Sequence, residues 1–81
     1  MTHDTPSLDT LRAMYPVASG SLTEFEMGAA SRLANLWYIY IKDYGVLGKP
    51  SIQLIYAQRA THLATPVSKA AFALLLTMVD G

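Results

Sequence analysis

The sequence contains no cysteine and few charges, and both features restrict what the protein can be. Without cysteine, a disulfide framework, an iron–sulfur cluster and a cysteine-based zinc site are excluded. Charged residues make up 15% of the 81 residues and hydrophobic ones 52%, against about 25% and about 45–50% in typical domains. A chain of this size buries only roughly 60–65% of its unfolded surface. We therefore expect one small domain over residues 1–81, with 1–5 as a flexible terminus, carrying more apolar surface than its core can hide.

Long hydrophobic runs and targeting signals are also missing. A membrane-spanning helix needs about 20 apolar residues, and the longest uncharged stretch in the hydrophobic part, Ala70 to Val79, has half that length. The first four residues lack the basic-then-apolar layout of a signal peptide. We expect a cytoplasmic protein that does not interact with membranes.

The charges balance overall but not along the chain. Six basic and six acidic residues give a net charge of zero. Residues 1–26 carry an excess of three acidic side chains, and residues 27–79 carry an excess of four basic ones. The basic residues lie about ten positions apart, so they form no patch in the sequence.

Capping residues and turn residues divide the chain into four predicted helices, and the fold class we predict is all-α. The first helix runs from about Pro6 to Tyr15, with Thr5 as its cap. Leu8, Leu11 and Tyr15 share one face of it.

The second helix has the strongest start signal, because Thr23 and Glu26 have the spacing of a capping box. It is predicted over 24–44, ending at Gly45, and is the long central element. Its expected buried stripe comprises Phe25, Ala29, Leu33, Leu36, Trp37, Tyr40 and Tyr44.

The third helix is predicted from Pro50 or Ser51 to about Leu63. Its expected buried face comprises Ile52, Ile55, Tyr56 and Leu63. Thr65 followed by Pro66 opens the fourth helix.

The fourth helix is apolar on two faces. Its core stripe comprises Val67, Ala71, Leu74 and Met78, and a second stripe comprises Phe72, Leu76 and Val79. Such a helix is either central in the fold or covered by another chain.

The segment 45–51 superficially resembles a phosphate-binding loop but lacks its spacing. Two residues separate Gly45 from Gly48 where the motif has four, and Pro50 removes an amide donor. An interhelix turn with Gly45 as a helix cap explains the segment better.

No residues have the spacing of a catalytic or metal site. His3 and His62 lack a histidine or carboxylate four residues away, as a metal site on a helix needs. Glu24 and Glu26 face about 200° apart on a helix, so they cannot act as an acid–base pair. We expect no enzymatic activity, cofactor or metal.

The surplus apolar surface favours a non-catalytic protein–protein interaction domain, such as an inhibitor, an adaptor or an assembly subunit. The sequence has five Tyr and four Met, and both types are enriched at protein interfaces. The predicted partner-binding residues are Tyr38, Ile39, Leu54, Phe72, Leu76 and Val79, with Lys42, Arg59 and Lys69 at the rim. A phage- or mobile-element-encoded inhibitor of host machinery, CRISPR systems included, has this general composition, although no motif specifies one.

Other interpretations of the sequence remain open. The stripe on the fourth helix could join two copies of the chain as a homodimer, or it could be buried within the chain. Alternatively, the chain is a small dimeric helix-turn-helix DNA-binding regulator. The third helix would then read the bases, and the side chains on or near it are Lys49, Ser51, Gln53, Gln58 and Arg59. The scarcity of basic residues makes nucleic acid the weaker alternative.

Overall fold

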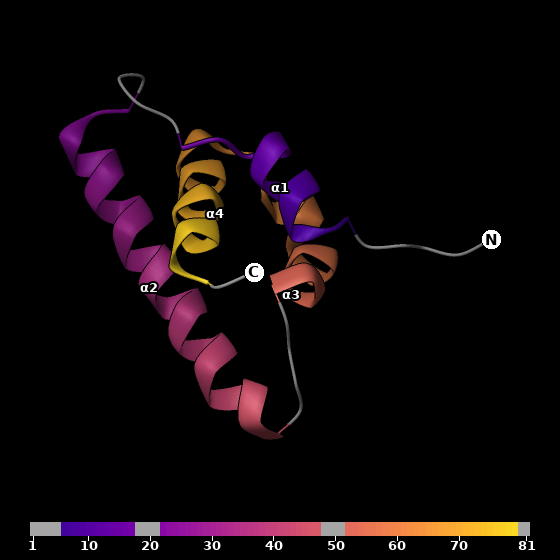
Figure 1. Ribbon diagram of the computed structural model, residues 1–81. Helices are drawn as coiled ribbons and strands as arrows, with labels where there is room; N and C mark the ends of the chain where they lie inside the picture. Colours follow the sequence, from indigo (N-terminus) through magenta and orange to yellow (C-terminus); the bar gives the residue numbers. More distant parts are fainter. Residues whose placement is uncertain (1–5, 18–21, 48–51, 80–81) are drawn as a thin grey trace.

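The computed structural model describes residues 6–17, 22–47 and 52–79, and these segments are helical with short connections (Figure 1). The helices are α1 (Leu8–Met14), α2 (Glu24–Leu47), α3 (Ile52–Arg59) and α4 (Pro66–Met78), with a 3₁₀ turn, η1 (Ala60–His62), after α3. The described part of the chain contains no strand, and the predicted all-α fold class is confirmed.

Helix α1 begins later than predicted, because Ser7 is its cap. The Ser7 hydroxyl accepts a hydrogen bond from the Thr10 backbone N–H at 3.2 Å. Thr5, the predicted cap, lies outside the described residues. Serine is preferred over threonine at the N-cap, which agrees with a helix that begins after Ser7. The predicted face is confirmed, since Leu11 is buried and Leu8 and Tyr15 pack against the core.

Helix α2 begins at the predicted capping box. The Thr23 N–H donates to Glu26 Oε1 at 2.9 Å, and the Glu26 N–H donates to Thr23 Oγ1 at 3.1 Å. The helix continues through Gly45 to Leu47, whereas the prediction ended it at Gly45. A glycine inside a helix costs only about 1 kcal/mol relative to alanine, so it does not have to end one.

The buried side of α2 is built on two alanines, Ala30 and Ala34, which are 0% and 1% exposed. Their small side chains permit a close approach between α2 and α4, which form the most extensive helix contact among the described residues. Larger α2 side chains pack half-buried around them; these are Leu33, Trp37, Tyr38 and Ile41.

The predicted buried stripe of α2 is therefore wrong at three of its members. Phe25 is 79% exposed, Leu36 64% and Tyr40 36%. The side chain of Tyr44 lies outside the described part. The prediction weighted large side chains, whereas the packing against α4 selects the side of α2 that carries alanines.

Helix α4 is the central helix of the fold. Figure 1 shows it between α2 on one side and α1 with α3 on the other. It begins with a second capping box, in which the Ser68 N–H donates to Thr65 Oγ1 and the Thr65 N–H donates to Ser68 Oγ, both at 3.1 Å. Its buried residues are Ala70, Ala71, Phe72, Ala73, Leu75 and Leu76.

This central position explains the two apolar faces of α4. Phe72 and Leu76, predicted to form an exposed stripe, are 0% and 1% exposed, so that prediction is wrong. A helix that is apolar on two faces is either central in its own fold or covered by another chain, and α4 is central in its own fold.

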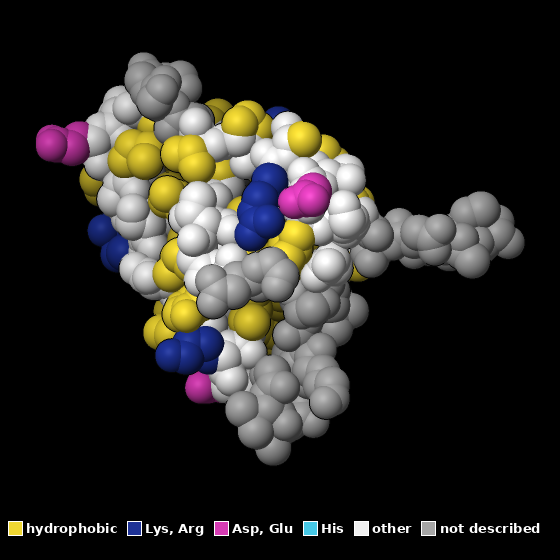
Figure 2. Space-filling model, in the orientation of Figure 1, with side chains coloured by type: hydrophobic (Ala, Val, Ile, Leu, Met, Phe, Trp, Pro, Cys, Tyr) yellow, Lys and Arg dark blue, Asp and Glu magenta, His cyan; other side chains and the backbone are white. Residues whose placement is uncertain are grey.

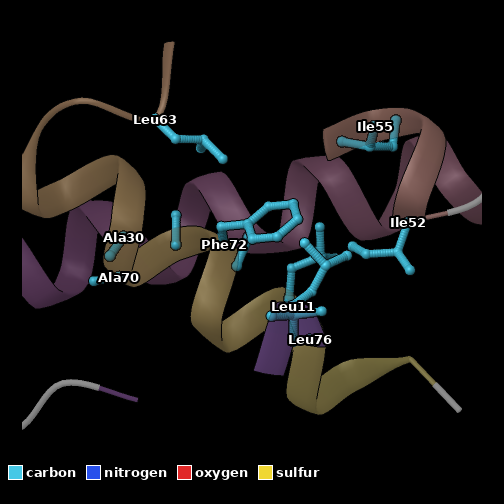
Figure 3. Close-up of a cluster of buried hydrophobic side chains, with 11 residues drawn as sticks. Leu11, Ala30, Ile52, Ile55, Leu63, Ala70, Phe72 and Leu76 are labelled. Carbon is cyan, nitrogen blue, oxygen red and sulfur yellow. The ribbon is translucent and has the colours of Figure 1, made fainter. Parts of the chain in front are cut away.

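Phe72 lies at the centre of an aromatic cluster to which every helical segment contributes. Its ring centroid is 5.1 Å from that of Tyr15 after α1, 6.2 Å from Trp37 of α2 and 5.8 Å from Tyr56 of α3. The contacts of Phe72 with Tyr15 and Trp37 are edge-to-face, whereas the Tyr56 ring is tilted at 48°. Edge-to-face contacts at such distances add about 0.5–1.5 kcal/mol each beyond the burial of area. Figure 3 shows the Phe72 ring among aliphatic core side chains, which come from α4 itself and from other parts of the chain.

The predicted buried face of α3 is confirmed. Ile52, Ile55 and Leu63 are at most 4% exposed, and Tyr56 packs half-buried against the core. The α-helix ends at Arg59, and η1 carries the chain to Leu63. Pro50 and Ser51, where the helix was predicted to begin, lie outside the described residues.

Candidate functional site

The predicted partner-binding residues do not come together on one surface. Tyr38 is half-buried against the core, with Lys42 Nζ 5.5 Å from its ring centroid. Val79 also packs against the core, and its carbonyl accepts a hydrogen bond from Arg12 Nη2 at 3.4 Å. With Phe72 and Leu76 buried, Ile39 is the one predicted apolar side chain that the described residues leave largely exposed, at 53%.

The remaining predicted residues are scattered. The side chain of Leu54 lies outside the described part of the chain. Lys42, Arg59 and Lys69 are exposed, but they lie on three different helices, α2, α3 and α4.

A different apolar surface is present on α2, on the side that faces away from α4. Most of the large exposed hydrophobic side chains of the described residues lie here, and we call this group the outer face of α2: Phe25, Leu36, Ile39 and Tyr40. At about 100° per residue, the four lie between about 120° and 180° around the helix from the buried Ala34. Figure 1 shows α2 along one edge of the molecule, and Figure 2 shows hydrophobic and charged side chains alternating along that edge.

The outer face has the spacing of a helix–helix seam. Steps of four and three residues lead along it from near the start of α2 to near its end, and we call these positions the outer seam: Phe25, Ala29, Arg32, Leu36, Ile39 and Asp43. Alternating steps of four and three keep successive side chains on one stripe of a helix, as in coiled coils. The prediction missed this seam because it assigned Phe25, Ala29 and Leu36 to the buried stripe. The alternation of four- and three-residue steps in the sequence is the pattern from which this seam could have been predicted.

Two opposite charges interrupt the outer seam. Arg32 and Asp43 are both exposed, and neither takes part in an ion pair within the described residues, where the one ion pair joins Arg12 and Asp9 at 3.7 Å. Eleven residues, or about 16 Å along the helix axis, separate Arg32 from Asp43. They are therefore too far apart to pair with each other within one chain.

A hollow in the described surface lies between the end of α1 and the start of α4. Tyr15, Leu22, Pro66 and Lys69 are among its lining residues, which include no carboxylate or imidazole. Burial raises the pKa of the Tyr15 phenol above its ordinary value of 10.0, and the neighbouring Tyr56 phenol adds to the rise. Tyr15 is therefore a neutral phenol at physiological pH, and the lining offers no acid–base pair.

A metal site and a membrane-spanning helix are both absent from the described segments. No group of three His, Cys, Asp or Glu side chains there could hold a metal ion. No helix of the described residues is long and apolar enough to cross a membrane. Of the residues predicted to read DNA, Gln58 and Arg59 are exposed on α3, whereas Lys49 and Ser51 fall outside the described part.

Comparisons with known proteins yield no relative. No protein-family model matches the sequence, and neither curated proteins nor solved structures give a significant match.

Proposed function

We propose that this protein is a non-catalytic protein-binding domain that docks through the outer face of α2. The observation that carries the proposal is the exposure of Phe25, Leu36 and Ile39 on one side of one helix, at 79%, 64% and 53%. Single exposed hydrophobic residues are ordinary, but several on one side of one helix, here with Arg32 between Phe25 and Leu36, are typical of an interaction site. An inhibitor, an adaptor and an assembly subunit would all use such a surface.

The shape of the patch favours a helical or extended protein segment as the ligand. The patch follows the helix for about 22 Å, from Phe25 to Tyr40, and it is convex because it lies on an outward-facing helix. Small molecules bind in concave pockets that enclose most of their surface, and a partner protein can instead pack its own apolar face along the ridge.

The proposal is tested by changing the patch without touching the core. Leu36→Glu introduces a carboxylate in the middle of the outer face, and Gln58→Glu introduces the same charge at an exposed position of α3. We expect both variants to retain the helical circular dichroism spectrum. When each is immobilised, the wild-type protein and Gln58→Glu should bind the same partner protein, and Leu36→Glu should not bind that partner. The partner can be a second copy of the chain.

Binding that survives in Leu36→Glu would place the interaction elsewhere and contradict the proposed function. A Leu36→Glu variant that unfolds would contradict the assignment of this side chain to the surface. Retention of the partner by Gln58→Glu is needed to show that the added charge alone is not responsible.

A further inference from the structure

We infer that the outer seam of α2 pairs with the same seam of a second copy, with the two α2 helices antiparallel. This inference rests on the proposed function, because it names the protein that covers the outer face. The observation that points to a second copy is a pair of opposite charges within an otherwise apolar seam, Arg32 and Asp43, which have no ion-pair partner among the described residues.

The antiparallel direction follows from the charges. In a parallel pair of helices, each seam residue lies beside its own equivalent, so Arg32 would face the partner's Arg32 and Asp43 the partner's Asp43. Like charges placed directly together cost several kcal/mol and disfavour the arrangement. In an antiparallel pair, residues before the two-fold axis face residues after it, and opposite charges can meet.

One antiparallel register pairs both charges and the two apolar side chains at the centre of the seam. When the two-fold axis passes level with the midpoint between Trp37 and Tyr38, Arg32 lies opposite the partner's Asp43 and Leu36 lies opposite the partner's Ile39. Each of these pairs occurs twice by symmetry. Sliding one helix by seven residues in either direction would place Asp43 against the apolar side chain of the partner's Ile39 or Phe25, and the ion pairs would be lost.

The dimensions of the molecule agree with this arrangement. Helix α2 has 24 residues, a length of about 36 Å, and the longest extent of the protein is 37 Å. Nothing in the described part of the chain covers the outer side of α2 (Figure 1). In this register the two α2 helices overlap over residues 28–47 without any movement of α1, α3 or α4, and Phe25 lies beyond the end of the partner's α2.

The first test is the mass of the purified chain by sedimentation velocity between about 1 μM and about 1 mM. We expect a concentration-dependent shift from monomer to dimer for the wild-type protein and for Gln58→Glu. Leu36→Glu, which places a carboxylate in both central layers of the seam, should remain monomeric. A wild-type chain that stays monomeric throughout, or a dimer that Leu36→Glu leaves intact, overturns the inference.

Charge reversal tests the register. Arg32→Glu alone places two acidic side chains opposite each other, and Asp43→Arg alone places two basic ones, so each should weaken self-association at least about tenfold. An equimolar mixture of the two variants should form a mixed dimer, detected by native mass spectrometry, because Glu at position 32 then faces Arg at position 43. Circular dichroism confirms that each variant is folded. If the single variants dimerise as tightly as the wild type, or if their mixture forms no mixed dimer, the antiparallel register is wrong.

The results also separate this inference from the proposed function. If the wild-type chain is monomeric but binds a different protein, and Leu36→Glu loses that protein, the inference fails and the proposed function stands. If the wild-type chain is monomeric and Leu36→Glu binds the same proteins as the wild type, both fail.

Discussion

Phe72 is the residue on which the packing of the four helices converges. Truncation to alanine removes a fully buried ring that contacts Tyr15, Trp37 and Tyr56. We expect Phe72→Ala to lower the free energy of unfolding by about 3–5 kcal/mol, measured by urea denaturation followed by circular dichroism. Phe25→Ala is the matched control, since Phe25 is 79% exposed, and it should change stability by no more than about 0.5 kcal/mol at low protein concentration. Similar losses in the two variants would contradict the assignment of Phe72 to the core.

Tyr15 makes stability depend on pH at the alkaline end. Its pKa is raised by burial and by Tyr56, so folding favours the neutral phenol over the phenolate. The resulting stabilisation is complete below the unfolded pKa of 10.0 and is lost as the pH rises through the folded value.

The measurement is chemical denaturation at about pH 9 and about pH 11. The wild-type protein should lose more stability between these values than Tyr15→Phe, which cannot ionise at this position. Equal losses would show that other groups produce the alkaline destabilisation.

Gly28 lowers the stability of α2, and substitution by alanine should remove this effect. The backbone there has no left-handed conformation, and a Cβ atom would meet only Arg32 Nη1, at an ordinary contact distance of 3.6 Å. Gly28→Ala should therefore raise the free energy of unfolding by about 0.5–1 kcal/mol, because alanine loses less backbone entropy in a helix. Ala57→Gly, at an exposed position of α3, should lower stability by a similar amount. A destabilised Gly28→Ala variant would show that the glycine serves a close contact at the outer face.

The starts of α2 and α4 could be predicted from the sequence because the capping residues that mark them are close together in the chain. The Thr23–Glu26 box and the Thr65–Pro66 start depend on residues within three positions of one another, and both begin helices where predicted. The side of α2 that is buried depends instead on α4. Because α2 carries large apolar residues almost all round, its sequence does not single out the side on which Ala30 and Ala34 allow a close approach.

For the molecule as a whole, composition predicted a surplus of apolar surface but not its location. The surplus was assigned mainly to α4, and the structure places α4 at the centre, with Phe72 and Leu76 buried. The exposed apolar side chains lie mostly on α2 instead, where the prediction named Tyr38 and Ile39, and of these two only Ile39 is largely exposed. Which of two apolar helices becomes central is decided by how all four pack together, and no local signal carries that information.

The same convergent packing predicts that the whole molecule unfolds as one cooperative unit. The single tryptophan, Trp37, contacts Phe72 and so reports on the junction of α2 and α4, while circular dichroism reports on all helices. Because Tyr15 and Tyr56 contact the same Phe72 ring, α1 and α3 should not detach before α2 and α4 separate. We expect urea transitions followed by tryptophan fluorescence and by circular dichroism to coincide, as two-state unfolding requires. A circular dichroism transition that begins at lower urea than the fluorescence transition would show instead that α1 or α3 is held only by its own local contacts.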